Sequence, residues 1–410
     1  MTPETAASRA IRAADPALSR SLRYHRPRGP LCGRGYCGQC QIATAAGTVL
    51  ACQVASHHHG APPGRLRVLG RVVERRTPWF WERRLLRPRR LRRFMLHALR
   101  YISSAPPLAP PPPRRPVRAY EELDAHTVVV GAGGDRPGAF VIEPARGDTV
   151  VGVYPARTLT LLRGDRMLTL RFELLVLDTG SYERLPPIPG NDLPGVVGLA
   201  AAERYGDQGA LRRGVKVAVW AAPDLFARAR ELAARRGLAL VWLHDVAPGA
   251  IAGNRNVEAV ITDRRIACDL FIVGVRQPAI ELALQAGATA KLSGDGLPIM
   301  ALSDTPPWLE LVGEAAASSS GVPDVVAADD ALACACADVR VSDLKACVAQ
   351  GFAHPELVKR RTGAMTGFCQ GKLCAAAVLA VLREQGVEPA PTRARPLARP
   401  IALGELAADA

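Results

Sequence analysis

The chain has 410 residues, of which 48% are hydrophobic and 22% are charged. This length and balance predict a globular protein of several domains and exclude global disorder. No run of about 18 uncharged apolar residues occurs, so we expect no membrane-spanning helix. The first residues carry scattered charges and lack the apolar core of an export signal. Ten cysteines without such a signal indicate metal binding or redox chemistry, and we expect a cytoplasmic protein.

The net charge of +15 is concentrated in one segment. Residues 65–118 contain 16 arginines and two acidic residues, a net charge of +14 that leaves about +1 elsewhere. Because no helix-turn-helix, zinc-finger or aromatic RNA-binding motif accompanies this charge, we expect no nucleic-acid partner. One interpretation is a solvated linker with one surface helix, ending in the stiff proline run at 109–113. The alternative is a docking surface for an acidic partner subunit or for a membrane face.

A first group of cysteines near the amino terminus follows the spacing C-x4-C-x2-C-x11-C. Its members are Cys32, Cys37, Cys40 and Cys52. A [2Fe–2S] cluster is held by four thiolates, and three of these come from one short loop. Glycines in the loop allow positive φ angles, which turn amide N–H groups toward the sulfides. Cys52 follows a strand-like run at 47–50 and returns the fourth ligand. Zinc is the alternative, but it prefers paired C-x2-C knuckles.

The segment 19–30 and the cysteine loop after it resemble the amino-terminal ferredoxin-like domain of heterotetrameric sarcosine oxidase alpha subunits. They also resemble the related opine oxidase, hydrogen cyanide synthase and dye-linked proline dehydrogenase subunits. The resemblance implies a β-grasp fold for residues 1–69. The first hairpin of that fold is expected to be missing, because the match begins almost at Met1.

A second group of cysteines lies near the carboxyl end, with the spacing C-x-C followed by C-x4-C. Its members are Cys334, Cys336, Cys369 and Cys374. This pattern, with its approach at 359–368, resembles the helical [2Fe–2S] domain of bacterioferritin-associated ferredoxin, which implies a second cluster; zinc is again the alternative. Ser342 is expected to cap the helix between the pairs, and Gly371 to supply the turn before Cys374.

The remaining cysteines and a histidine run are expected to have no ligand role. Cys347 lies in a predicted helix and Cys268 at the edge of a predicted strand, so both are interpreted as small core residues. His57, His58 and His59 are interpreted as part of a surface loop.

The middle of the chain has the pattern of an α/β domain. Apolar runs at 127–130, 215–220 and 238–243 predict buried strands, and a helix over 224–236 completes one βαβ unit. Short strands are expected at 271–274 and 309–313. By its resemblance to the same family, the run from Gly131 to Gly133 is the opening of an FAD-binding motif. Glu314 holds the place of a flavin ribityl contact.

This nucleotide motif departs from a working one. The sequence G-x-G-x-x-G needs glycine at position 136, where this chain has Arg136. Residues 134–138 lead straight into a strand at 139–143, which predicts a hairpin in place of the crossover helix that a dinucleotide site needs. The second candidate loop, 221–224, has no glycine. We therefore interpret Gly131, Gly133 and Glu314 as a vestigial FAD site and expect neither FAD nor NAD.

Together these features predict a multidomain α/β chain with five parts. These are a β-grasp ferredoxin-like [2Fe–2S] domain (1–69), a basic, proline-rich linker (70–119), a degenerate Rossmann-like domain related to two-dinucleotide-binding proteins (120–325), a small helical [2Fe–2S] domain (331–385) and a tail (386–410).

The resemblance implies an electron-transfer subunit of a flavin-dependent dehydrogenase or oxidase acting on sarcosine, opines, proline or hydroxyproline. Its partners would be a flavoprotein subunit and an external electron acceptor, with the basic segment 65–118 as a candidate for peripheral membrane contact. The chain alone is not expected to be catalytic. Two alternatives stay open: a subunit with its own FAD site, and an iron–sulfur regulatory or assembly protein.

Overall fold

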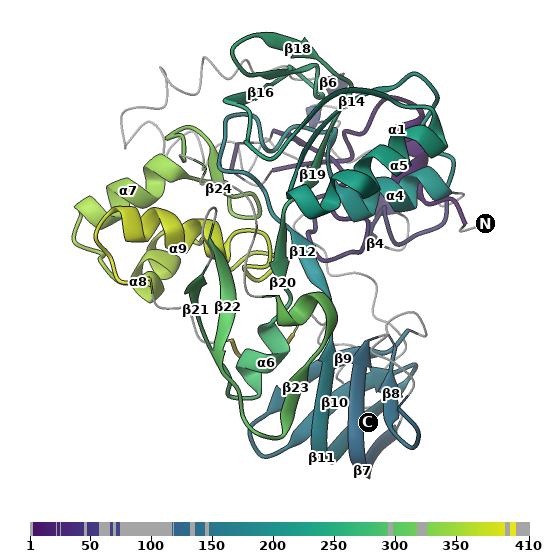
Figure 1. The fold of residues 1–410 in the computed structure, drawn as a ribbon, viewed down its shortest axis with the longest axis vertical. Coiled ribbons are helices and arrows are strands. Elements are labelled where there is room, and N and C mark those ends of the chain that lie inside the picture. Colours follow the sequence, from purple (N-terminus) through teal and green to yellow (C-terminus); the bar gives the residue numbers. More distant parts are fainter. Residues whose placement is uncertain are drawn as a thin grey trace.

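The computed structural model describes most of the chain outside the basic segment and the extreme tail. The described residues are 3–21, 23–24, 26–44, 47–56, 66–68, 71–73, 117, 119–131, 136–143, 147–293, 298–317, 325, 327–389 and 394–398. Figure 1 shows two α/β parts joined by a pair of strands, with a helical part beside them. The described chain is thus a multidomain α/β protein with a Rossmann-like sheet.

The amino-terminal part consists of one helix and short two-stranded sheets. Its elements are α1 (Ala6–Arg12), β1 (Ser19–Arg20) paired with β2 (Pro27–Arg28), β3 (Gln41–Thr44) paired with β4 (Gly47–Leu50), and β5 (Leu66–Val68) paired with β6 (Arg71–Val73). Strand β4 lies where the sequence predicts it, directly before Cys52. The β-grasp assignment of this part stays a prediction.

A larger sheet follows, in the order β8-β7-β11-β10-β9, with β23 paired to β11. Its strands are β7 (Ala119–Gly131), β8 (Phe140–Ile142), β9 (Thr149–Tyr154), β10 (Thr158–Arg163), β11 (Arg166–Asp178) and β23 (Leu309–Leu311). Strands β8, β7, β11 and β23 are mutually parallel, while β10 runs antiparallel to both of its neighbours, β11 and β9.

The predicted hairpin after Gly131 is therefore wrong, because β8 runs parallel to β7 with Val128 opposite Phe140. The physical reason is the shortness of β8. Its three residues pair with Val128 to Val130, near the carboxyl end of β7. The chain therefore has to move back along β7 by only about three residues before β8 begins. A full crossover helix is not needed for such a brief parallel pairing.

A second sheet has the order β13-β19-β14-β15 and is parallel throughout. Its elements are β13 (Val196–Gly198), α4 (Leu199–Asp207), β14 (Lys216–Ala221), the 3-10 turn η2 (Pro223–Leu225), α5 (Phe226–Arg236), β15 (Ala239–His244) and β19 (Leu270–Gly274). The predicted βαβ unit is confirmed in β14, α5 and β15. Gly237 ends α5 in the left-handed conformation, with φ of 64°.

Two smaller, separate sheets accompany this one, and one of them links it to the larger sheet. A three-stranded antiparallel sheet comprises β16 (Ala250–Ala252), β17 (Ala259–Ile261) and β18 (Arg265–Ala267). The link between the two sheets is the antiparallel pair β12 (Ser181–Glu183) and β20 (Arg276–Pro278), visible at the centre of Figure 1.

The carboxyl-terminal part is helical. It follows α6 (Glu281–Gln285), the hairpin of β21 (Thr289–Ser293) and β22 (Ile299–Asp304), and η3 (Gly313–Ala316). Its own elements are β24 (Leu332–Cys334), β25 (Val339–Arg340), α7 (Val341–Ala349), α8 (Pro355–Thr362) and α9 (Ala375–Glu384).

The predicted capping role of Ser342 is wrong, because α7 already begins at Val341 and its cap is Arg340. The carboxylate of Asp343 accepts a hydrogen bond from the Arg340 backbone N–H at 3.1 Å. This contact satisfies the backbone at the helix start and places Ser342 inside the first turn.

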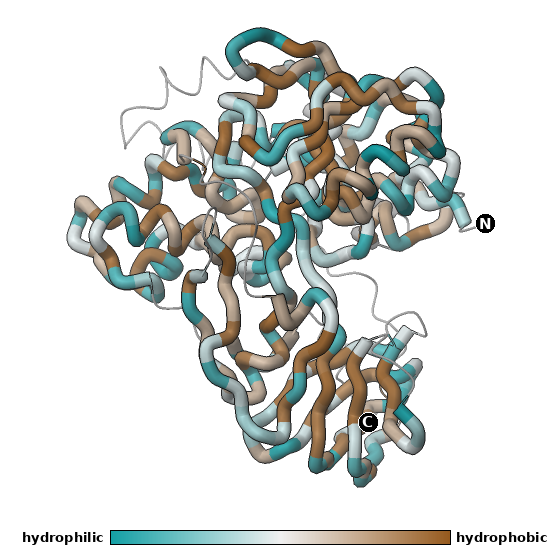
Figure 2. Tube along the Cα trace, viewed as in Figure 1, coloured by the Kyte–Doolittle hydropathy of each residue, from teal (hydrophilic) through white to brown (hydrophobic). Residues whose placement is uncertain are grey.

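Apolar side chains fill the space between these elements. Figure 2 shows hydrophobic residues along the central strands of the larger sheet, with hydrophilic residues at their ends. Val128, Leu175 and Leu177 are completely buried there. Cys268 and Cys347 are buried as expected, at 2% and 3% exposure. Among the described residues, no helix is both long and apolar enough to cross a membrane.

Several predicted features lie outside the described residues. They are the histidine run at 57–59, Gly133, the tryptophan-containing run at 79–81, the proline run at 109–113 and most of the tail.

Candidate metal centres

The first four cysteines come together in the structure. Cys32, Cys37 and Cys40 lie in the loop between β2 and β3, and Cys52 follows β4. The pairing of β3 with β4 brings Cys52 back to this loop, and the N–H of Ala51 donates to the carbonyl of Cys40 at 2.8 Å. All four side chains are at most 1% exposed. The Cys32 thiol contacts those of Cys37 and Cys52, and Cys52 also contacts Cys40.

The local backbone of this loop agrees with the expected role of its glycines. Gly33, Gly35 and Gly38 all have positive φ, at 61°, 84° and 68°. The backbone N–H of Gln39 lies 3.5 Å from the sulfur of Cys37 and donates to it. The side-chain amide of Gln53 donates to the sulfur of Cys52 at 3.6 Å. Two N–H donors therefore already face the sulfurs of this set.

The second four cysteines also come together. Cys334 ends β24, Cys336 follows it, and Cys369 and Cys374 flank the turn that precedes α9. The Cys369 thiol contacts those of Cys336 and Cys374, and Cys374 contacts Cys334. Gly371 has a φ of 88° between Cys369 and Cys374, in agreement with the predicted turn. Cys336 is partly exposed, whereas the other three are buried.

Burial makes Cys32 and Cys37 of the first set poor thiolates unless a cation accompanies them. Desolvation raises the pKa of Cys32 to about 12 and holds the pKa of Cys37 well above its ordinary value. In the second set, contacts with Cys336 and Cys374 lower the pKa of Cys369. A bound metal would supply the positive charge that such a set needs.

The donor set fits a [2Fe–2S] cluster in each group, because each provides four thiols and such clusters take four cysteine ligands. Within the described part of the chain, no three His, Cys, Asp or Glu side chains converge as ligands of a single metal ion would.

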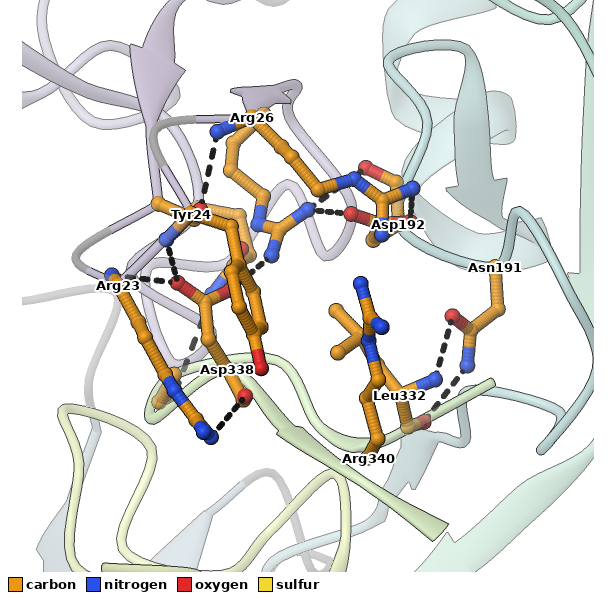
Figure 3. A network of polar contacts seen from close by, with 12 residues as sticks. Arg23, Tyr24, Arg26, Asn191, Asp192, Leu332, Asp338 and Arg340 are labelled. Atoms are coloured by element: carbon orange, nitrogen blue, oxygen red, sulfur yellow. Dashed lines mark hydrogen bonds and ion pairs between the residues drawn. The ribbon is translucent and has the colours of Figure 1, made fainter. Parts of the chain in front are cut away.

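A buried ion-pair network joins the strand before the first cysteine loop to the middle of the chain and to the segment after Cys336. Figure 3 shows the polar contacts around Asp192 and Asp338. Arg28, in β2, pairs with Asp192 and with Asp338, and all three side chains are at most 3% exposed. Asp338 also accepts the backbone N–H groups of Arg23 and Tyr24, at 2.7 and 3.2 Å. Desolvation lowers the pKa of Arg28 to about 10, so the guanidinium stays charged at neutral pH. A single arginine thus joins the approach to the first cysteine loop to the segment after Cys336.

The predicted flavin-site residues lie at the carboxyl ends of the larger sheet. A Cβ on Gly131, which has a φ of 111°, would lie 2.0 Å from the carbonyl oxygen of Asp178, so only glycine fits there. Glu314 accepts a hydrogen bond from Ser181 at 2.6 Å and forms an ion pair with Arg276. Arg136 pairs with Glu310 at 2.6 Å. Glu314 and Arg136 are therefore both engaged in ion pairs with other side chains of the protein.

Sequence reasoning missed the residues that connect the parts. Gln39 was visible inside the first motif, but nothing local to the motif indicates what its side chain contacts. Arg28 and Asp338 are separated by 310 positions, so their pairing has no local signal.

Comparisons with known proteins agree with this architecture. Residues 331–410 match the family model described as the sarcosine oxidase A3 domain. L-proline dehydrogenase from P. horikoshii has a similar fold, with a TM-score of 0.69 and 14% identity over 98% of this chain and 94% of that chain. No curated protein gives a match to the sequence.

Two further structures match about half of this chain. A FAD-dependent pyridine nucleotide-disulphide oxidoreductase from Desulfovibrio vulgaris is 22% identical, covering 46% of this chain and 62% of its own, with a TM-score of 0.31. An NAD-dependent persulfide reductase from A. fulgidus is 13% identical, covering 48% and 53%, with a TM-score of 0.30. The family match covers the carboxyl-terminal part of the chain, and the proline dehydrogenase structure shows a similar fold over nearly its whole length.

The buried network gives a stability prediction. Replacing Asp338→Asn removes one of the two buried carboxylates that pair with Arg28, so the Arg28 charge is only partly compensated. We expect a loss of about 3 kcal/mol and a fall in Tm of several degrees. The control is Glu122→Gln, which breaks an exposed pair with Arg171 and is expected to change stability by less than about 0.5 kcal/mol. Calorimetry measures both. Equal effects of the two changes would contradict the central role of Asp338.

Proposed function

We propose that this chain is an iron–sulfur electron-transfer subunit of a flavin-dependent amino-acid dehydrogenase or oxidase complex. One observation carries the proposal: eight of the ten cysteines form two sets of four, and each set is gathered from its own loops into contact. Buried neutral thiols cost little by themselves, but two sets of four, each at the spacing of an iron–sulfur motif, supply the eight ligands that two binuclear clusters need.

Each set of residues has a definable task. Cys32, Cys37, Cys40 and Cys52 would hold one [2Fe–2S] cluster, and Cys334, Cys336, Cys369 and Cys374 the other. A cluster of this type accepts and releases one electron when bound. The chain itself orients the sulfurs, excludes water from them, and donates N–H groups from Gln39 and Gln53 toward them. Such donors tune the reduction potential of a cluster.

The middle of the chain serves as the scaffold in this proposal. The guanidinium of Arg204, on α4, donates to the carbonyl of Gly33 in the first cysteine loop at 2.9 Å. The hydroxyl of Tyr36 donates to Glu183 of β12 at 2.6 Å. These contacts fix the first loop against the nucleotide-like sheet. The ion pairs of Glu314 and Arg136 are consistent with a flavin site that no longer binds flavin.

The proposed substrate class is supported by the comparisons alone. The protein with the similar fold is a proline dehydrogenase, and the matching carboxyl-terminal domain is that of sarcosine oxidase. We infer a complex that oxidises a secondary amine or imino acid on a separate flavin subunit. The cytoplasmic side of the cell is the proposed location.

The first prediction concerns metal content. Iron and sulfide should each amount to about four per chain in anaerobically purified protein, because two binuclear clusters need eight thiolates. Cys37→Ser and Cys369→Ser should each lower iron by about two per chain. Cys268→Ala, which removes a buried thiol outside both sets, should leave the iron content unchanged. Stoichiometric zinc in place of iron would refute the proposal.

The second prediction concerns flavin. The chain purified alone should carry no FAD, because Glu314 and Arg136 are engaged by Arg276 and Glu310. Arg136→Gly should not create FAD binding, since the segment after Gly131 returns to β8 over a short connection. Absorbance of the purified chain and of its denatured supernatant measures this. One tightly bound FAD per chain would instead favour the alternative of a subunit with its own flavin site.

The third prediction concerns partnership. Removal of a hydride needs a two-electron acceptor such as flavin, so the isolated chain should not oxidise an amine. Co-expression with its flavin subunit should give dye-reducing activity. Cys37→Ser and Cys369→Ser should lower electron transfer to the dye at least tenfold, while substrate still reduces the flavin at a nearly unchanged rate.

Stopped-flow absorbance separates these two steps, and mass spectrometry after purification from the native host identifies the partner. The basic segment 65–118 is the candidate interface, because its arginines and aromatic residues have the composition of interface hot spots. Recovery of the chain without any flavoprotein at low salt would contradict the assignment.

A further inference from the structure

The two cysteine sets meet across one internal interface. The sulfur of Cys336, in the second set, lies 3.7 Å from the backbone carbonyl oxygen of Cys37, in the first set. These residues are 299 positions apart in the sequence. Only one side chain and one carbonyl group therefore separate a ligand position of one set from a ligand position of the other.

Gln39 contacts a sulfur of each set. Its backbone N–H donates to the sulfur of Cys37 at 3.5 Å. Its side-chain Nε2 lies 3.8 Å from the sulfur of Cys336 and 3.2 Å from the carbonyl oxygen of Cys37, within donating distance of both. The side chain is only 8% exposed, so these contacts are shielded from water. A buried amide that donates to sulfur and carbonyl at this place has an electrostatic effect on both sets.

The surrounding interface is closely packed. A Cβ on Gly38 would lie 2.6 Å from the ring of Phe368, so the first loop approaches the second without room for a side chain. Cys32 and Cys37 of the first set share one apolar cluster with Ala335, Cys369 and Leu373 around the second. The contact at Gln39 is therefore held rigidly by the packing beside it.

We propose that the two cysteine sets form a single electron-transfer unit, in which the Cys37 carbonyl and the Gln39 side-chain amide bridge to Cys336. This inference rests on the proposed function, since it requires a one-electron iron–sulfur centre in each set. In each exchange the donor centre is oxidised by one electron and the acceptor centre is reduced by one. No atom is transferred, so no further reactant is needed.

Gln39 is a positioning residue in this unit. Its side-chain N–H stabilises negative charge on the Cys336 sulfur, which favours the reduced state of the second centre. Its backbone N–H does the same for Cys37 and is retained when the side chain is changed. The side chain can therefore be altered to affect the second centre while the first keeps its donor.

The first experiment uses the whole chain and electron paramagnetic resonance. In fully reduced wild-type protein, the two centres should show spin–spin broadening or splitting and rapid relaxation, because they lie close together. Cys369→Ser, which is expected to lose the second centre only, should return the first signal to a simple, slowly relaxing form. Two unperturbed signals in wild-type protein that contains four irons per chain would overturn the inference.

The second experiment compares two glutamines by redox titration. Gln39→Leu removes the side-chain donor to Cys336 at similar volume. It should shift the oxidised-to-reduced ratio of the second centre about tenfold toward the oxidised form, a fall in potential of about 59 mV. Gln53→Leu is the matched control, since Gln53 donates to Cys52 of the first set alone. It should lower the potential of the first centre and leave the second unchanged.

The outcomes distinguish this inference from the function on which it rests. Absence of iron and sulfide from the wild-type chain would contradict the proposed function itself. Four irons per chain, with an unchanged second potential in Gln39→Leu, would contradict the bridge alone. If Gln39→Leu does not fold, the comparison of wild-type protein with Cys369→Ser still decides whether the two centres interact.

Discussion

The buried pairing of Arg28 with Asp338 and Asp192 is the constraint on which the arrangement of this chain depends. It joins a strand before the first cysteine loop, a turn of the middle domain and the segment that follows Cys336. A buried charge of this kind is costly unless every partner is in place. The network therefore favours one relative placement of the two loops. That placement brings Cys336 to the carbonyl of Cys37.

In the proposed function, the nucleotide-like region serves as a scaffold for the two cysteine loops. Its larger sheet pairs β7 and β11 in parallel, with a close approach of Gly131 to Asp178 at the carboxyl ends of these two strands. The charged residues at those ends pair with one another, as Glu314 does with Arg276. The same region presents α4 and β12 to the first cysteine loop. The fold by itself does not decide which site this region carries, so its role as a scaffold rests on the proposed function.

The sequence was informative where the signal is local. Strand β4, the βαβ unit of β14, α5 and β15, and the turn at Gly371 all follow from short patterns of apolar residues and glycines. The direction of β8 was predicted wrongly, because a short connection suits a hairpin and a brief parallel pairing equally well. Ser342 was a reasonable cap by residue type, but Asp343 already satisfies the backbone of Arg340.

The cysteine spacings predict two sets of four ligands. In the structure the thiols of each set interact with one another, and the assignment of a cluster to each set stays a prediction. The contact between the groups could not be predicted, because it depends on Gln39 and Cys336 meeting across the folded interior. Nothing in the first motif specifies the partner of the Gln39 side chain. Such long-range contacts depend on packing and on buried charges such as that of Arg28. Neither produces a periodic pattern in the sequence.

The central claim is that the two cysteine sets hold two binuclear iron–sulfur clusters. Mössbauer spectroscopy of the iron-loaded chain tests it most directly, because it distinguishes mononuclear, binuclear and cubane iron. The account predicts two equally populated diamagnetic [2Fe–2S] species in the oxidised protein, each of which gains one electron on reduction. A spectrum of mononuclear iron, or of a single cluster shared by the chain, would contradict it.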